Sequence, residues 1–213
     1  MDNEIAAGVE VQHPLTANAV VTRVRLIQEV MRKVMKKDTH YGVIPGCAKP
    51  SLWKPGAEQL LVTFRIAPDQ PRVEDLSSSD SVRYRVTRTG ISNGVTVASG
   101  IGECSSDEEK YKWRAPVCAA EYEATPEDRR RMKWRRDGSS YQQVRTNPAD
   151  VANTILKMAD KRAFVAMTLL ATAASDIFTQ DLEDLPEEIV QAVEGSNPKP
   201  APIADPQPKA KPA

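Results

Sequence analysis

The chain has 213 residues, 40% of them hydrophobic, and its 29 Lys and Arg residues balance its 29 Asp and Glu residues. This size and composition allow one domain with a buried core. Three cysteines without paired spacing argue against a secreted disulfide framework and favour reduced thiols. No uninterrupted apolar run reaches the roughly eighteen residues of a membrane span.

Residues 16–37 are predicted to form the first helix, because apolar residues recur there at steps of three and four. These residues are Val20, Val24, Ile27, Met31 and Val34. The turn-rich run HYGVIPG, residues 40–46, follows this helix. A second helix is predicted from Pro55, since proline suits the first helical position. Pro68 and Pro71 then end it.

Residues 81–89 and 95–103 are predicted to form a β-hairpin, because apolar and polar side chains alternate in both segments. The intervening GISNG, residues 90–94, supplies turn residues. Arg83 and Arg85 fall on the wet face of the first strand. Two interpretations stand: the arginines keep a solvated strand soluble, or they bind a polyanion.

Residues 115–146 are polar, with little apolar periodicity. This pattern is typical of a long loop or of an inserted helical segment, and loops of that length are often functional or mobile. The segment is therefore treated as a flexible insertion.

A long helix is predicted from Asn147, which suits an N-cap and precedes a proline. It continues through residues 151–174, with its C-terminal half largely buried. Lys157 and Lys161 are four residues apart and share a face, with Arg162 beside them. They form either a positive edge of the helix or ion pairs with nearby acids. The acids in question are Asp150 and Asp160.

Two segments interleave cations with aromatic rings. They supply Lys110, Tyr111, Lys112, Trp113 and Arg114 from KYKWR, and Lys133, Trp134 and Arg135 from MKWRR. Single-stranded nucleic acid is bound by cations along the phosphates and by rings stacked on bases. The alternative is that each tryptophan is anchored in the core, with cations snorkelling around it.

The sequence gives little indication of catalysis. It has no phosphate-binding loop of the GxxxxGK[ST] type and no Ser-His-Asp or Cys-His arrangement. We therefore expect a protein that is not an enzyme and has no cofactor. Four acids, Asp176, Asp181, Glu183 and Asp184, are the weak candidates for a metal site, and a solvated surface is the alternative.

Four blocks carry a resemblance to a known family: HYGVIPG at His40, KPGAEQLL at Lys54, KYKWR at Lys110 and NTILKMADKRAFVAMTLLATAASDIFTQD at Asn153. Together they resemble phage recombination proteins akin to the single-strand annealing superfamily, which includes Erf, Redβ and the Rad-fifty-two-like proteins. The Lys161-Arg162-Ala163 step is similar to the core helix of that superfamily.

The resemblance implies an α+β fold, in which a small antiparallel sheet or hairpin packs on a long core helix. An N-terminal helix precedes this core, and a disordered C-terminal tail follows it. Homo-oligomeric rings or filaments would bind DNA in a positive groove shared by neighbouring subunits and lined by Lys161, Arg162, Arg83 and Arg85, the two hairpin arginines matching by pattern only. The implied function is ATP-independent binding and annealing of single-stranded DNA.

The implied annealing domain covers residues 1–195, and residues 196–213 form a proline-rich tail. The tail is a candidate for recruiting a single-strand-binding protein or a phage exonuclease, and a solubilising extension is the alternative. With no signal peptide expected, the location would be the cytoplasm of the cell or phage host. Two other functions remain: single-strand binding without annealing, and metal-dependent DNA processing through Asp176, Asp181 and Asp184.

Overall fold

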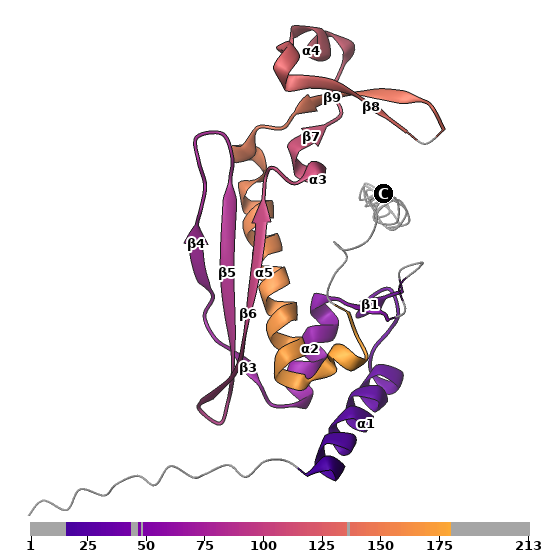
Figure 1. Cartoon of the computed structure of the whole chain (residues 1–213), viewed down its shortest axis with the longest axis vertical. Helices are drawn as coiled ribbons and strands as arrows, with labels where there is room; N and C mark the ends of the chain where they lie inside the picture. Colours follow the sequence, from indigo (N-terminus) through magenta and orange to yellow (C-terminus); the bar gives the residue numbers. More distant parts are fainter. Residues whose placement is uncertain (1–15, 44–46, 48, 136, 180–213) are drawn as a thin grey trace, which may run out of the picture.

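The computed structural model describes residues 16–43, 47, 49–135 and 137–179. The fold is α+β, with small antiparallel sheets and a long helix packed against strands (Figure 1). The proline-rich tail proposed at 196–213 lies outside the described residues. In chain order the elements are α1 Ala17–Lys33, β1 Tyr41–Gly42, β2 Ser51–Leu52, α2 Lys54–Thr63, β3 Ala67–Pro68, β4 Arg72–Asp75, β5 Arg83–Ser92, β6 Val95–Ser105, α3 Glu109–Lys112, β7 Trp113–Arg114, α4 Ala119–Ala124, η1 Glu127–Arg129, β8 Arg130–Trp134, β9 Ser140–Arg145, α5 Pro148–Thr172 and η2 Ala174–Asp176.

Strands β5 and β6 confirm the predicted hairpin. Ser92 pairs with Val95, so the connection is the two-residue turn Asn93-Gly94. Both turn residues have positive φ, 50° and 77°, as a type I′ hairpin turn requires. Strands β3 and β4 pair with the other edge of β5, which completes a four-stranded antiparallel sheet.

Helix α5 covers one face of this sheet at very short range. A Cβ atom on Gly102 would lie 2.3 Å from the Ala159 oxygen and 2.3 Å from the Ala163 nitrogen. One on Gly100 would lie 2.2 Å from the Met167 nitrogen. Glycine on the strand and alanine on the helix therefore let the two backbones touch.

The start of α5 follows its local sequence, as predicted, and the helix ends at Thr172, two residues before the predicted 174. The Asn147 side chain accepts a hydrogen bond from the Ala149 N–H at 3.1 Å, and Pro148 opens the helix. Ala173 ends it in the left-handed conformation, with φ of 56°. The C-terminal half is buried, and Phe164 and Leu169 join the main core with α1 and α2.

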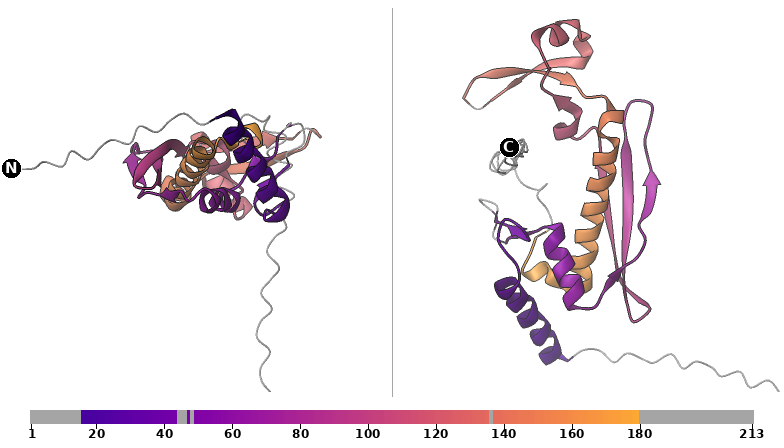
Figure 2. Two further views of the ribbon diagram at one scale, coloured as in Figure 1. Left: turned by 90° about the horizontal axis from the view of Figure 1, so that it is seen from below. Right: turned by 180° about the vertical axis from the view of Figure 1, so that it is seen from behind.

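Helix α1 is shorter than the predicted 16–37 and is only partly covered. Thr16 caps it, and Ile27 and Val30 are buried, but Val20 and Val34 are 47% and 48% exposed. The N-terminal end of the helix projects from the body, and its C-terminal half reaches the core (Figures 1 and 2). The helix is confirmed, and the apolar stripe is buried only in part.

Residues 115–146 hold more regular structure than the predicted loop or helical insertion. They contain the short helix α4 and the β8–β9 hairpin, and β7 joins the hairpin in a three-stranded sheet of order β7-β9-β8. Both faces of this sheet carry charged side chains, so the apolar period of a half-buried strand is missing. Sequence periodicity could not find it for that reason.

Helix α5 is the central element, and the other groups of helices and strands are arranged around it. The three-stranded sheet projects beyond its N-terminal end, and α1, α2 and the β1–β2 pair lie at its C-terminal end (Figures 1 and 2). Both groups extend to the side of α5 away from the β5–β6 hairpin. The two sides of α5 therefore present different surfaces.

Candidate nucleic-acid interface

Arg83 and Arg85 lie on the face of the sheet that points away from α5. Their neighbours Tyr84 and Val86 point to the other face and pack with α5. Both arginines form ion pairs with Glu103 of β6, and the Arg85 pair measures 2.9 Å. Hydrogen bonds from Arg83 and then Arg85 lower the pKa of Glu103, although its partial burial acts the other way.

Within one chain, these arginines and the α5 cations therefore lie on different sides of the sheet, and a groove shared between neighbouring subunits stays a prediction. The sheet stands between Arg83 and Arg85 on one side and α5 on the other. Alternation along β5 correctly identified the wet face, but it carried no information about what lay across the sheet.

Arg162 is held inside the protein. Its Nη1 and Nη2 donate to Glu108 at 2.7 and 2.9 Å, and Nη1 also donates to the Glu103 carbonyl. Burial alone would raise the pKa of Glu108, but the hydrogen bonds and charge of Arg162 outweigh it and lower that pKa. The helix cation thus pairs with an acid fifty-four positions away, and neither Asp150 nor Asp160 is the partner in these bonds.

The side chains of Cys104 and Tyr111 also lie near Glu108. Burial, and then the adjacent Glu108 carboxylate, raises the pKa of Cys104 to about 12. Burial is likewise the main reason why the pKa of Tyr111 is raised. Tyr111 therefore packs beside the sheet–helix contact, rather than presenting a free ring as KYKWR suggested.

We predict that Arg162→Ala lowers the free energy of unfolding by about 2–3 kcal/mol, because Glu108 loses both hydrogen bonds in a mostly buried place. The folded-state pKa of Glu108 is lowered, so its stabilisation is present above the ordinary carboxyl pKa and is lost as pH falls through the folded value. Urea unfolding at neutral and acidic pH measures both effects. Arg114→Ala, which breaks an exposed pair with Glu121, is the control and should cost less than about 1 kcal/mol. Equal losses for the two variants, or an undiminished Arg162 loss in acid, would contradict this role.

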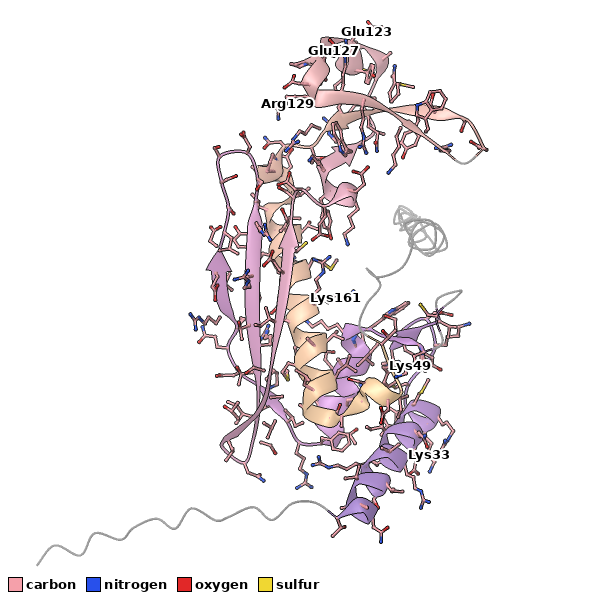
Figure 3. The ribbon with its side chains drawn as sticks, in the orientation of Figure 1. Lys33, Lys49, Glu123, Glu127, Arg129 and Lys161 are labelled. Carbon is pink, nitrogen blue, oxygen red and sulfur yellow. The ribbon has the colours of Figure 1, made fainter. Side chains whose placement is uncertain are left out.

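Lys161 points away from the β5–β6 hairpin, to the side where the two projecting groups face each other (Figure 3). Lys161 is exposed by its surface area, but partial desolvation of its ammonium group, followed by the positive charges of Lys110 and Lys54, lowers its pKa. The structure gives Lys161 no hydrogen bond or ion pair with another described residue. Lys157, one turn earlier, is exposed on the same side of the helix.

Lys54 also lies beside α5, although the sequence did not predict it as a DNA-binding residue. It lies at the start of α2, and its Nζ sits 5.7 Å from the centre of the Phe164 ring, one turn beyond Lys161 on α5. Lys110 comes from α3, and its ion-pair partner Glu108 also binds Arg162 of α5. Lys54 thus contacts α5 at Phe164, and Lys110 is linked to α5 through Glu108 and Arg162, and no spacing in the sequence could have indicated either link.

The remaining members of KYKWR are mostly engaged. Lys112 pairs with Asp107 at 3.7 Å, and Arg114 points to the α4 side of the three-stranded sheet, where it pairs with Glu121. Trp113 is half-buried, with the Arg131 guanidinium 4.2 Å from its ring centre. For Trp113, the structure resembles the anchored-ring alternative.

The MKWRR segment is more open. Lys133 pairs with Glu109 at 3.1 Å, and the Arg135 guanidinium lies 4.7 Å from the centre of the Tyr141 ring. Trp134, between them, is 71% exposed. Strand β8 alternates, so Trp134 and Met132 share one face while Lys133 lies on the other.

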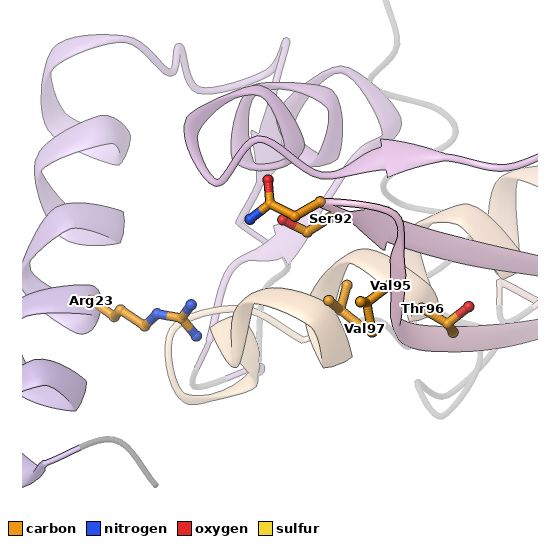
Figure 4. Close-up of a pocket in the computed structure, with 6 residues that line it drawn as sticks. Arg23, Ser92, Val95, Thr96 and Val97 are labelled. Atoms are coloured by element: carbon orange, nitrogen blue, oxygen red, sulfur yellow. The ribbon is translucent and has the colours of Figure 1, made fainter. Parts of the chain in front are cut away.

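A hollow of about 460 Å³ lies at the tip of the β5–β6 hairpin of the four-stranded sheet (Figure 4). Arg23 of α1 faces it, and the hairpin tip supplies the other lining residues, namely Ser92, Asn93, Val95, Thr96 and Val97. None of the residues predicted to bind DNA lines it.

Among the described residues, no three His, Cys, Asp or Glu side chains form a group suited to a metal ion. Asp176 belongs to η2, whereas Asp181, Glu183 and Asp184 lie outside the described part of the chain. No helix in that part is long and apolar enough to cross a membrane.

Comparisons with protein-family models, with curated proteins and with solved structures gave no match to this chain.

Proposed function

We propose that this protein binds single-stranded DNA and promotes annealing of complementary strands without ATP and without catalysis. The observation that carries the binding part is Trp134, a large ring 71% exposed between Lys133 and Arg135. A tryptophan so exposed loses the burial that usually stabilises it, and a stacking base restores that contact.

The lysines on α5 are a second candidate surface, separate from Trp134, which shares the α4 face of the three-stranded sheet with Arg114 and Arg130. Lys161 points away from the β5–β6 hairpin (Figure 3), and Lys157, four residues earlier on the helix, is exposed and adds positive charge to the same side. Phosphate contacts from such lysines are independent of sequence and release counterions. The outer sheet face is a weaker candidate, because Glu103 already neutralises Arg83 and Arg85.

Annealing follows from holding the backbone while the base edges stay free. Neutralised phosphates repel a second strand less, and one protein face can then present bases for pairing. Support for this part is the resemblance of HYGVIPG, KPGAEQLL, KYKWR and the α5 block to phage annealing proteins.

The test combines binding and annealing on the full chain. Anisotropy of a labelled thymidine oligonucleotide should give an affinity that falls steeply with salt, with a log–log slope of about −0.7 for each phosphate bound. Mixing complementary strands with the protein and no nucleotide cofactor should speed duplex formation. Binding without faster annealing would identify a plain single-strand binder, and absence of binding would refute the proposal.

We also propose that the protein self-associates through the open edge of strand β6. In the described part of the chain, β6 pairs with β5 alone, which leaves its other edge open. Residues 95–102, VTVASGIG, carry neither the charge nor the proline with which edge strands usually avoid pairing. The opposite edge consists of the short β3 and β4 with Pro68 and charged side chains.

We predict that Ile101→Lys reduces the mass of any homo-oligomer measured by light scattering. Ile101 is 62% exposed on β6, and a lysine there protects an edge. The matched control is Val62→Lys on α2, where the side chain is 76% exposed but no strand edge is open. An oligomer unchanged by Ile101→Lys would exclude this edge as the contact.

A further inference from the structure

We propose that the acidic segment 181–194 of this chain docks on the surface of α5 that carries Lys157 and Lys161. The segment comes soon after Thr179, the last described residue. If the proposed function holds, this contact competes with single-stranded DNA for the two lysines and is autoinhibitory. The docking itself does not depend on DNA binding.

The segment and the surface carry opposite charges. Lys157 and Lys161 are exposed, and neither makes an ion pair with another described residue. The acid next to Lys161 in the sequence, Asp160, pairs with Arg88 at 2.6 Å instead. The segment DLEDLPEEIVQAVE has no lysine, arginine or histidine, and its acids are Asp181, Glu183, Asp184, Glu187, Glu188 and Glu194. It can therefore supply the negative charge that the described residues do not give to these lysines.

The last described residue is fixed against β2. Thr179 accepts a hydrogen bond from the Leu52 N–H at 3.1 Å and pairs with β2 in the parallel sense. The next N–H along the chain, that of Trp53, donates to the His40 carbonyl on the β1 side at 3.0 Å. Thr179 therefore lies at the edge of β2 opposite β1, and the chain leaves it in the direction of Lys54, where α2 begins.

From this edge the acidic segment can reach both lysines. The β1–β2 pair and Lys161 lie on the same side of α5, away from the β5–β6 hairpin (Figures 1 and 3). Phe178 packs in the same core as Phe164, which follows Lys161 by one turn. An extended segment of this length spans up to about 46 Å, and the 25 residues of α5 span about 37 Å.

The tether makes weak contacts sufficient. A short link holds the segment at an effective concentration of about a millimolar or more beside α5. Exposed ion pairs are individually weak and are screened by salt. The docked segment therefore exchanges, leaves the lysines partly accessible, and yields to a ligand that carries more charge.

The first arm of the test is carbodiimide cross-linking of the full chain without DNA, read by mass spectrometry. Amide cross-links should join Lys157 and Lys161 to carboxylates of residues 181–194. They should disappear in about 1 M salt, where the Debye length falls to about 3 Å. Lys36 and Lys37, exposed beyond the end of α1, are the control. A segment that cross-links to these two lysines as often as to those of α5, or to none, would overturn the docking.

A mixture of isotopically labelled and unlabelled chains tests for a second copy as the source of the segment. Docking within one chain predicts cross-links that join two labelled or two unlabelled peptides. Cross-links that join a labelled to an unlabelled peptide as often would place the segment of a neighbouring molecule on α5 and reject the tethered contact.

The second arm measures the effect on DNA binding. Glu183→Gln, Asp184→Asn and Glu187→Gln together should tighten binding of the thymidine oligonucleotide at low salt by about 5-fold. The gain should vanish when Lys157→Gln and Lys161→Gln are also present, because the acids then have no partner on α5. No gain, or the same gain in both backgrounds, would refute autoinhibition through these lysines. If no variant binds the oligonucleotide while the cross-links form, the proposed function fails and the docking stands.

Discussion

Gly102→Ala is expected to lower the free energy of unfolding by at least about 3 kcal/mol, a large effect for one methyl group. The new Cβ would meet the Ala159 oxygen and the Ala163 nitrogen at 2.3 Å, and both are backbone atoms that cannot rotate away. Either β6 or α5 would have to move. Urea unfolding followed by circular dichroism measures the loss.

Thr96→Ala is the matched control for this change. It lies on the same strand, but its side chain is exposed, so its effect should stay within about 0.5 kcal/mol. Similar stability for the two variants would mean that β6 and α5 do not approach as closely as described. The position of Lys161 on the far side of α5 would then lose its support.

Trp134→Ala is expected to weaken binding of single-stranded DNA by about 5- to 150-fold, because base stacking on an aromatic ring contributes about 1–3 kcal/mol. The ring is 71% exposed, so its removal should hardly change the melting temperature. Anisotropy with the thymidine oligonucleotide measures the affinity. The salt slope should stay the same, since no phosphate contact is removed.

Two variants make this result specific. Trp134→Phe keeps a flat ring and should retain most of the affinity. Met132→Ala removes another exposed apolar side chain from the same face of β8 and should leave binding unchanged. Equal affinity for Trp134→Ala and the wild type would mean that the exposed Trp134 ring does not stack on a base, and the proposed DNA binding would lose its main support.

Local signals in the sequence predicted several elements well. The cap at Asn147 placed the start of α5, and the run GISNG, residues 90–94, indicated the hairpin connection, although β5 continues to Ser92 and only Asn93 and Gly94 form the turn. The β8–β9 hairpin escaped prediction because Lys133 and Trp134 occupy opposite faces and neither face is apolar.

The candidate site was less predictable than the fold, because its contacts join distant segments. Arg162 looked like part of a positive helix edge, yet Glu108 holds it from a different element. Lys54 precedes the predicted helix start at Pro55, and in the structure its Nζ lies 5.7 Å from the centre of the Phe164 ring of α5. Charge type is visible in a sequence, but the partner of each charge is set by tertiary structure.

The most direct test of the central claim is a lysine acetylation footprint, read by mass spectrometry, with and without the thymidine oligonucleotide. The account predicts that bound DNA protects Lys157 and Lys161 on α5 while Lys33 on α1 is modified as before. Equal modification of all three lysines in the two samples, under conditions where the oligonucleotide is bound, would contradict it.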